Sequence, residues 1–246
     1  MRLPFNISCG WTVVFLGVGA LVFGQGYAPG NSIGEPPGGD PVLRGEVRID
    51  MEPVFALDAD VPYPIDDTTA RRRALNEAAL FFSAMIYGWS FQYEIGERAR
   101  GIAEDMELTP LGEIRWGDPR LFATDAQVRE RRLYLWVDYR PSEEQIRRLS
   151  FWRAGTVRNA QAVGYGPSGA PRDGADWYAI TKAALEDAAR SGIRAMLRGS
   201  ERNRPKEARG VIALAEFPSY RMDAGRWTAR ARFRVQITEI IPFAAY

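Results

Sequence analysis

The chain almost lacks the side chains that perform most acid–base, thiol and zinc chemistry in proteins. Its 246 residues contain no histidine and one cysteine, Cys9. One thiol forms no disulfide within the chain, and without imidazole there is neither a zinc site of the usual kind nor a histidine general base. We therefore expect no cofactor and no metal, and we predict that the protein is not an enzyme.

The chain also lacks an excess of charge of either sign. Thirty-two lysine and arginine residues oppose 31 aspartate and glutamate residues, and Lys182 and Lys206 are the two lysines. Nonspecific binding to nucleic acid needs a net basic surface, whereas the arginine runs of this chain are interleaved with acids. We expect no nucleic-acid partner.

Long apolar runs are absent except near the start. Residues 11–23 are apolar apart from Thr12 and two glycines, and they follow the basic residue Arg2, a pattern typical of a secretory signal peptide. We expect cleavage after Gly24, export to the periplasm or the outer membrane, and no transmembrane segment in the mature chain. Residues 3–23 also reach the length of a membrane span, so an uncleaved anchor is the alternative.

A weak internal repeat follows the N-terminal segment. Residues 74–79 are echoed by residues 184–189, and seven positions within 112–139 match positions within 210–237 at one constant offset. Two unrelated units, each a helix followed by a hairpin, would give the same pattern. The resulting division is a signal peptide (1–24), a Gly/Pro-rich tether (25–41), a first repeat (42–140), a linker (141–155) and a second repeat (156–246).

Each repeat is predicted to contain a strand, a helix and two further strands. Polar and apolar residues alternate in the expected strands, and apolar residues recur every three or four positions in the expected helices. The predicted fold class is α+β, with one amphipathic helix on a small antiparallel sheet in each repeat. In the first repeat the elements are 43–52, 69–87, 112–116 and 132–139, and in the second they are 156–164, 176–197, 210–218 and 225–238.

Between the first helix and its hairpin, the first repeat carries an insertion that the second repeat lacks. Trp89, Phe91 and Tyr93 alternate with polar residues there, which predicts an additional strand with one aromatic side. Because this row distinguishes the two repeats, we interpret it as a candidate assembly surface. The alternative is that the three rings belong to the core.

The final strand of each repeat places unusual side chains on its outer side. In the second repeat these are Arg230, Arg232 and Arg234, which favour an anionic partner such as a carboxylate-rich protein, a glycan or a lipid phosphate. In the first repeat they are Tyr134 and Trp136, which favour a protein contact or glycan stacking. The alternatives are a solvated arginine face and an aromatic face that covers the other repeat.

Two acid pairs are the remaining candidates for chemistry. Asp66 and Asp67 precede the first helix, and Glu104 and Asp105 lie in a polar connection. Paired carboxylates hydrolyse glycosides only when they face each other across a substrate, which neighbouring residues rarely do. Asp66 and Asp67 are also well placed to cap the helix.

The second repeat resembles a known bacterial family. The residues that carry the resemblance are Ala162, Val163, Gly164, Tyr165, Gly166, Ala179, Ala183, Ala184, Asp187, Ala188, Ala189, Leu197, Gly210, Tyr220, Gly225 and Trp227. This pattern is similar to the LPP-type envelope lipoproteins and to the amino-terminal domain of flagellar assembly protein T. The resemblance implies a non-enzymatic protein of the outer membrane or periplasm with a role in flagellar structures, although the lipidated cysteine of the family is absent here.

Taken together, these patterns predict an exported structural or protein-interaction module of the cell envelope. Its expected partner is an envelope or flagellar protein. The first alternative is a periplasmic polysaccharide-binding protein that uses cell-wall glycan as its ligand. The second is a carboxylate-dependent glycan hydrolase.

Overall fold

The computed structural model describes residues 41–52, 64–96, 101, 103–168, 174–200 and 206–242. The expected signal peptide and all but the last residue of the expected tether lie outside these residues. Within them, no helix has both the length and the apolar character needed to cross a membrane.

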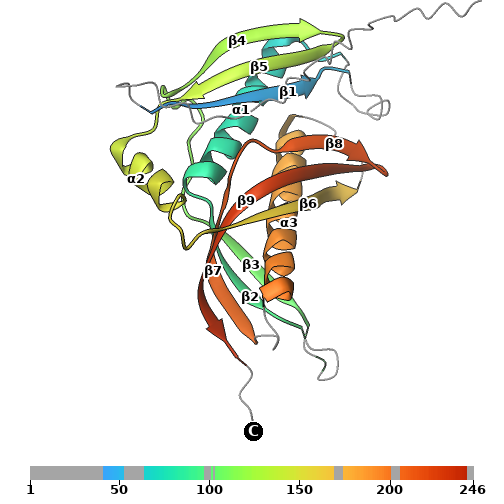
Figure 1. The fold of residues 1–246 in the computed structure, drawn as a ribbon. Coiled ribbons are helices and arrows are strands. Elements are labelled where there is room, and N and C mark those ends of the chain that lie inside the picture. The colour runs from blue at the N-terminus through green and yellow to red at the C-terminus, as the bar shows by residue number, and fades with distance from the viewer. Residues whose placement is uncertain are drawn as a thin grey trace, which may run out of the picture. The chain divides into compact units, whose positions relative to one another are not determined.

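The described residues form three helices and nine strands in two antiparallel sheets (Figure 1). This confirms the predicted α+β class. The first sheet has the order β1-β5-β4 and the second has the order β3-β2-β7-β9-β6, with β8 also paired to β9. The strands are β1 (Leu43–Asp50), β2 (Trp89–Glu94), β3 (Asp105–Pro110), β4 (Leu121–Arg129), β5 (Arg132–Tyr139), β6 (Arg158–Ser168), β7 (Glu207–Leu214), β8 (Ser219–Asp223) and β9 (Arg226–Ile241).

Helix α1 (Asp67–Ile86) lies between the two sheets and is buried on nearly every side after its first two turns. It contacts β1, β4 and β5 of the first sheet, and also β7 and helix α3 (Gly174–Ser200). The Asp66 side chain caps α1 by accepting a hydrogen bond from the Thr69 backbone N–H at 2.9 Å, as its position before the helix predicts. A helix with neighbours on opposite sides must be apolar around most of its circumference, which explains its continuous buried run.

The first and last strands of each half of the chain pair in the same way. β1 pairs antiparallel with β5, and β6 pairs antiparallel with β9, with one helix following the first strand in each case. The insertion strand β2 pairs with β7, so a strand from the first half completes the sheet of the second half. The division into two repeats remains a prediction. The second sheet contains strands from both halves of the chain.

The predicted strand at residues 112–116 is wrong. This segment connects β3 to β4, and the Ile114 backbone N–H donates to the Ser83 hydroxyl of α1 at 2.8 Å instead of joining a sheet. The hairpin partner of β5 is β4, joined to it by a two-residue turn at Glu130 and Arg131 with φ values of 50° and 59°. Such turns usually contain Asn-Gly, so the sequence gives little sign of this one.

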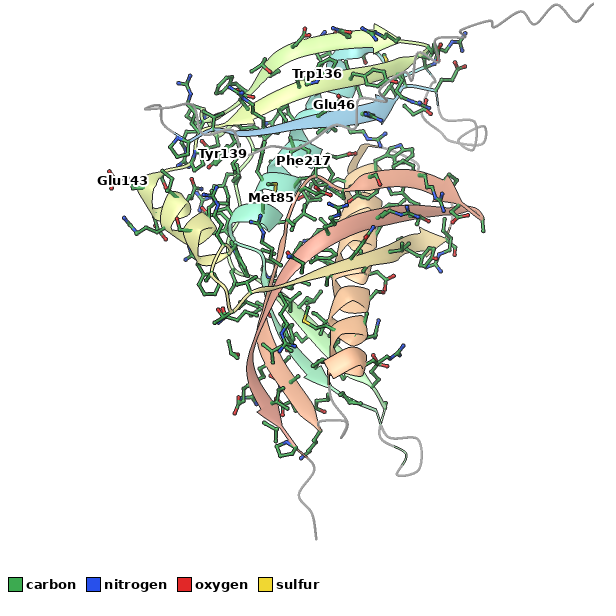
Figure 2. All side chains as sticks on the ribbon, viewed as in Figure 1. Glu46, Met85, Trp136, Tyr139, Glu143 and Phe217 are labelled. Atoms are coloured by element: carbon green, nitrogen blue, oxygen red, sulfur yellow. The ribbon has the colours of Figure 1, made fainter. Side chains whose placement is uncertain are left out.

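Phe217, in the connection from β7 to β8, reaches across to α1 and β1 (Figure 2). The centre of its ring lies 4.8 Å from the centre of the Phe82 ring and 5.2 Å from the centre of the Phe81 ring, both in edge-to-face orientation. A Cβ at Gly45 of β1 would overlap the Phe217 ring. Gly45 therefore makes room for a side chain from the other half of the chain.

Helix α2 (Glu143–Phe151) confirms the helix predicted from Ser142. Ser142 and Gln145 form a capping box, in which each side chain accepts a hydrogen bond from the other residue's backbone N–H. The Gln145 amide also donates to the Tyr87 hydroxyl at 2.7 Å and to the Tyr139 hydroxyl at 2.9 Å. One residue thus starts α2 and attaches it to α1 and the first sheet.

Candidate functional site

The outer side of the first sheet carries the best candidate interaction site. Inner residues of β1 and β5 are buried against α1, so the alternate residues point to the opposite side. We call this side the aromatic face. Its members are Arg44, Glu46, Arg48, Phe122, Asp125, Gln127, Tyr134, Trp136 and Asp138.

The strand register fixes the neighbours of each ring on the aromatic face. Trp136 of β5 lies between Glu46 of β1 and Asp125 of β4, and Figure 2 labels Trp136 and Glu46 on neighbouring strands. Tyr134 lies between Arg48 and Gln127 in the next row of the same face. Both rings are half-buried, so part of each remains available for contact.

Four of the five charged side chains on the aromatic face form ion pairs with one another. The Arg48 Nε lies 2.5 Å from a Glu46 carboxylate oxygen, and the Arg44 Nε lies 3.5 Å from an Asp138 carboxylate oxygen. The Arg48 guanidinium also lies 5.6 Å from the centre of the Tyr134 ring. These contacts hold rigid rings and oriented hydrogen-bonding groups together on one sheet surface, without excess charge of one sign among the described pairs.

A second polar cluster closes one end of the first sheet. Asp118 accepts hydrogen bonds from Arg120, which hold the pKa of the carboxyl below its ordinary value. Burial raises the pKa of the Tyr139 hydroxyl, and that hydroxyl contacts Gln145. The cluster is connected throughout by hydrogen bonds, so we assign it to the attachment of α2.

A buried ion pair at the junction of α1 and α3 was not predicted from the sequence. Arg73 and Glu77 of α1 pair at 2.9 Å, and both side chains are almost fully buried. The Arg73 guanidinium lies 3.9 Å from the centre of the Trp177 ring of α3. An i,i+4 arginine–glutamate pair usually marks an exposed helix face, so its spacing in the sequence points the wrong way.

Aromatic rings from the second sheet extend this buried cluster. Trp177 contacts Trp227 of β9, and Tyr220 of β8 stacks on Trp227 with 5.7 Å between the ring centres. Burial raises the pKa of Glu77 in spite of the nearby Arg73 charge, and burial together with the Glu77 charge raises the pKa of Tyr220. The cluster joins α1, α3 and the second sheet around one charged pair.

The predicted assembly surface at Trp89, Phe91 and Tyr93 is corrected by the structure. All three lie on β2, as predicted, but their side chains are buried, with exposed fractions of 4%, 3% and 5%. β2 is an interior strand of the second sheet, paired with β3 and β7, and its inner side belongs to the hydrophobic core. These rings are part of the hydrophobic core and are not an exposed surface.

The arginine row lies where the sequence predicts it. Arg230 and Arg232 are exposed on the outer side of β9, and Arg234 is half-buried on the same side. Arg232 lies 3.4 Å from a carboxylate oxygen of Glu216. Burial lowers the pKa of Arg234, and the nearby charge of Arg153 lowers it further.

The acid pairs have other contacts in the structure. Asp66 caps α1, and the hydrogen bonds from Thr69 lower its pKa. Asp67 forms an ion pair with Arg71 at 2.5 Å, and Glu104 forms one with Arg194 of α3. Burial raises the pKa of Glu104, but the hydrogen bonds from Arg194 and Tyr93 and the charges of Arg194 and Arg198 together outweigh it, so the pKa lies below its ordinary value. In the part of the chain that the structure describes, no cluster of three or more carboxylate or thiol side chains is arranged to hold a metal ion.

Comparison with known proteins corrects the resemblance inferred from the second repeat. A protein of Treponema pallidum (strain Nichols), described as an uncharacterized protein, is 24% identical over 213 residues, which cover 84% of this chain and 87% of that protein. No match to LPP-type lipoproteins or to flagellar assembly protein T is found. No solved structure matches the chain significantly.

The residues behind the mistaken resemblance are explained by packing. A Cβ at Gly164 of β6 would overlap the backbone of α3 at Ala184 and Ala188, and both alanines are fully buried. Small residues at these positions are what any helix packed closely on a strand requires, whatever its family.

A protein-family model matches residues 33–243, which is most of the chain, and the chain therefore belongs to the family that this model defines.

Proposed function

We propose that this protein is a non-enzymatic, exported module of the cell envelope that binds another envelope protein through the aromatic face. The observation that carries the proposal is the pair of half-buried rings, Tyr134 and Trp136, on the outer side of a sheet whose inner side is already filled by α1. Rigid aromatic rings bury a large area at a low entropic cost, and they are enriched in protein interfaces.

The charged neighbours suit the same role. Arginine is enriched with tyrosine and tryptophan among the residues that dominate binding energy. Arg48 lies beside Tyr134, and its guanidinium is already held by Glu46, so little side-chain freedom is lost when a partner docks. We expect export because the apolar pattern of residues 11–23 is typical of a signal peptide.

A cell-wall glycan is the alternative partner, and one feature favours it. Trp136 lies between two carboxylates, Glu46 and Asp125, on the neighbouring strands. A sugar ring stacked on Trp136 would place its hydroxyls near acceptors on either side, since carboxylate oxygens accept hydrogen bonds.

The test compares variants of the aromatic face in living cells. Trp136→Ala with Tyr134→Ser should remove the recurrent crosslinks to envelope proteins that mass spectrometry identifies for the wild-type chain. The matched control is Trp116→Ala, because Trp116 is 54% exposed and lies outside the aromatic face. Thermal unfolding of each purified variant should remain close to wild type.

Two results would contradict the proposal. Crosslinks that survive in the Trp136 and Tyr134 variant would show that the partner uses a different surface. Loss of binding to purified cell-wall polysaccharide in that variant, with no protein crosslinks in the wild type, would assign the aromatic face to a glycan.

A further inference from the structure

The charges that this fold leaves unpaired are sorted by sign along the outer side of the second sheet. On the first sheet, each arginine of β1 lies beside a carboxylate. On the second sheet, unpaired arginines lie around the first half of β9, and unpaired acids lie on β2 and β3. Figure 1 shows β9 running the length of this sheet, from its pairing with β8 to its pairing with β7.

The basic end is centred on Arg230 and Arg234, which are unpaired, with Arg232 between them in an ion pair with Glu216. Their partners across the β6 pairing are Val163, Gln161 and Asn159, none of which carries a charge. Among the described residues, neither Arg230 nor Arg234 has a carboxylate within ion-pair distance, and the same holds for Arg153 near Arg234. We call this end the arginine row.

The acidic end is formed by Glu94 of β2 with Asp105 and Glu107 of β3. The register pairs Glu94 with Asp105 directly, and Glu107 lies two residues further along β3 on the same side. All three side chains are exposed, and none forms an ion pair with another described residue. We call this end the acidic row.

The two rows lie on the same side of the sheet. Tyr93 and Phe91 of β2 are buried on the inner side, as are Phe233 and Val235 of β9, whose side faces α3. Alternate residues point to opposite sides of a strand, so Glu94 and Arg234 both point outward. The outer side therefore has opposite charges at its two ends.

We propose that this side of the second sheet binds a second copy of the chain, with the arginine row of each copy against the acidic row of the other. The arrangement has two-fold symmetry, so both contacts form at once from one self-complementary surface. The proposal is independent of the partner proposed for the aromatic face.

The spacing of the charges supports a second copy as the occupant. Alternate residues of an extended strand recur at about 6.7 Å, and both Arg230 to Arg234 and Asp105 to Glu107 follow this period. A strand of one copy can thus place successive carboxylates beside successive guanidiniums of the other. The surface is polar, so we expect a weak dimer whose affinity falls steeply with salt.

Charge reversal gives a decisive test by sedimentation velocity of the full chain at low and high salt. Arg230→Glu with Arg232→Glu makes both rows acidic, and Glu94→Arg with Glu107→Arg makes both rows basic. Each double variant alone should dimerise at least about tenfold more weakly than wild type, because like charges then face each other. A mixture of the two should dimerise, because both contacts are complementary again.

The matched control is Arg129→Glu with Arg147→Glu, which makes the same change in net charge at exposed arginines outside this face. It should dimerise like wild type. A monomeric wild-type chain at low salt overturns the proposal, and so does a dimer that neither double variant weakens. If the wild type is monomeric but binds vesicles of anionic phospholipid through Arg230 and Arg232, the arginine row belongs to a membrane contact instead.

Discussion

At the scale of single residues, the most unusual feature is a charge placed where water is excluded. Glu77 is 3% exposed, and its neighbour Arg73 is held against the Trp177 ring. Removing two ions from water costs several kcal/mol, which their mutual attraction offsets only in good geometry. We therefore expect this pair to contribute more to the specificity of the helix junction than to its stability.

The raised pKa of Glu77 predicts a pH dependence of stability. Because burial makes this pKa higher in the folded than in the unfolded chain, the folded state holds its proton more tightly. The contribution is present below the unfolded pKa of about 4.3 and is lost as the pH rises through the folded pKa. Glu77→Gln removes this titration, so its stability relative to wild type should increase with pH. Urea denaturation across a series from weakly acidic to weakly basic pH measures the difference.

The partner residue supplies the control for this titration. Arg73→Met leaves the Glu77 carboxylate buried without a cation and should destabilise the chain by about 3–5 kcal/mol at neutral pH. Adding Glu77→Gln to that variant should recover most of the loss. A difference between wild type and Glu77→Gln that stays constant with pH would refute the role assigned to Glu77.

At the scale of elements, the contact between β1 and the connection from β7 to β8 depends on one missing side chain. The Phe217 ring occupies the place of a Cβ at Gly45, and it packs on Phe81 and Phe82 of α1. This contact links the first sheet to the second half of the chain through three aromatic rings. The alternation in the sequence of β1 shows that residue 45 points inward, but not what it meets.

Gly45→Ala should therefore destabilise the protein by about 1–3 kcal/mol through overpacking against Phe217. Chemical denaturation measures the change. Gly155→Ala is the matched control, since a Cβ there meets no atom within 4 Å, and it should leave stability nearly unchanged. Phe217→Leu should lessen the effect of Gly45→Ala. Equal stability of the two alanine variants would show that the ring moves aside freely.

At the scale of the whole molecule, the residues that the structure describes between 41 and 242 form one compact unit in which the halves share structure. β2 from the first half pairs with β7 from the second, and α1 contacts α3. Separating the halves would expose Trp89, Phe91 and Tyr93 and leave one edge of β2 unpaired. The halves therefore depend on each other for their cores.

We expect these shared contacts to make unfolding a single cooperative transition. Tryptophan fluorescence and far-UV circular dichroism should report the same midpoint in urea, since coincident probes indicate two-state behaviour. A fragment of residues 41–140 should be largely unfolded by circular dichroism. Two separated transitions, or a folded fragment, would show that the halves are independent domains.

Local sequence patterns predict most of the helices and strands and the side of each that is apolar. The alternation in β9 predicts its arginine side, the apolar spacing predicts α1 and α3, and Ser142 predicts the start of α2, because each pattern depends on residues close together in the chain. The tertiary structure alone decided which sides are covered. It buried β2 against the core, placed the Arg73–Glu77 pair between two helices, paired β4 with β5 and left Tyr134 and Trp136 partly open. Those outcomes depend on contacts between residues far apart in the chain, which no local pattern records.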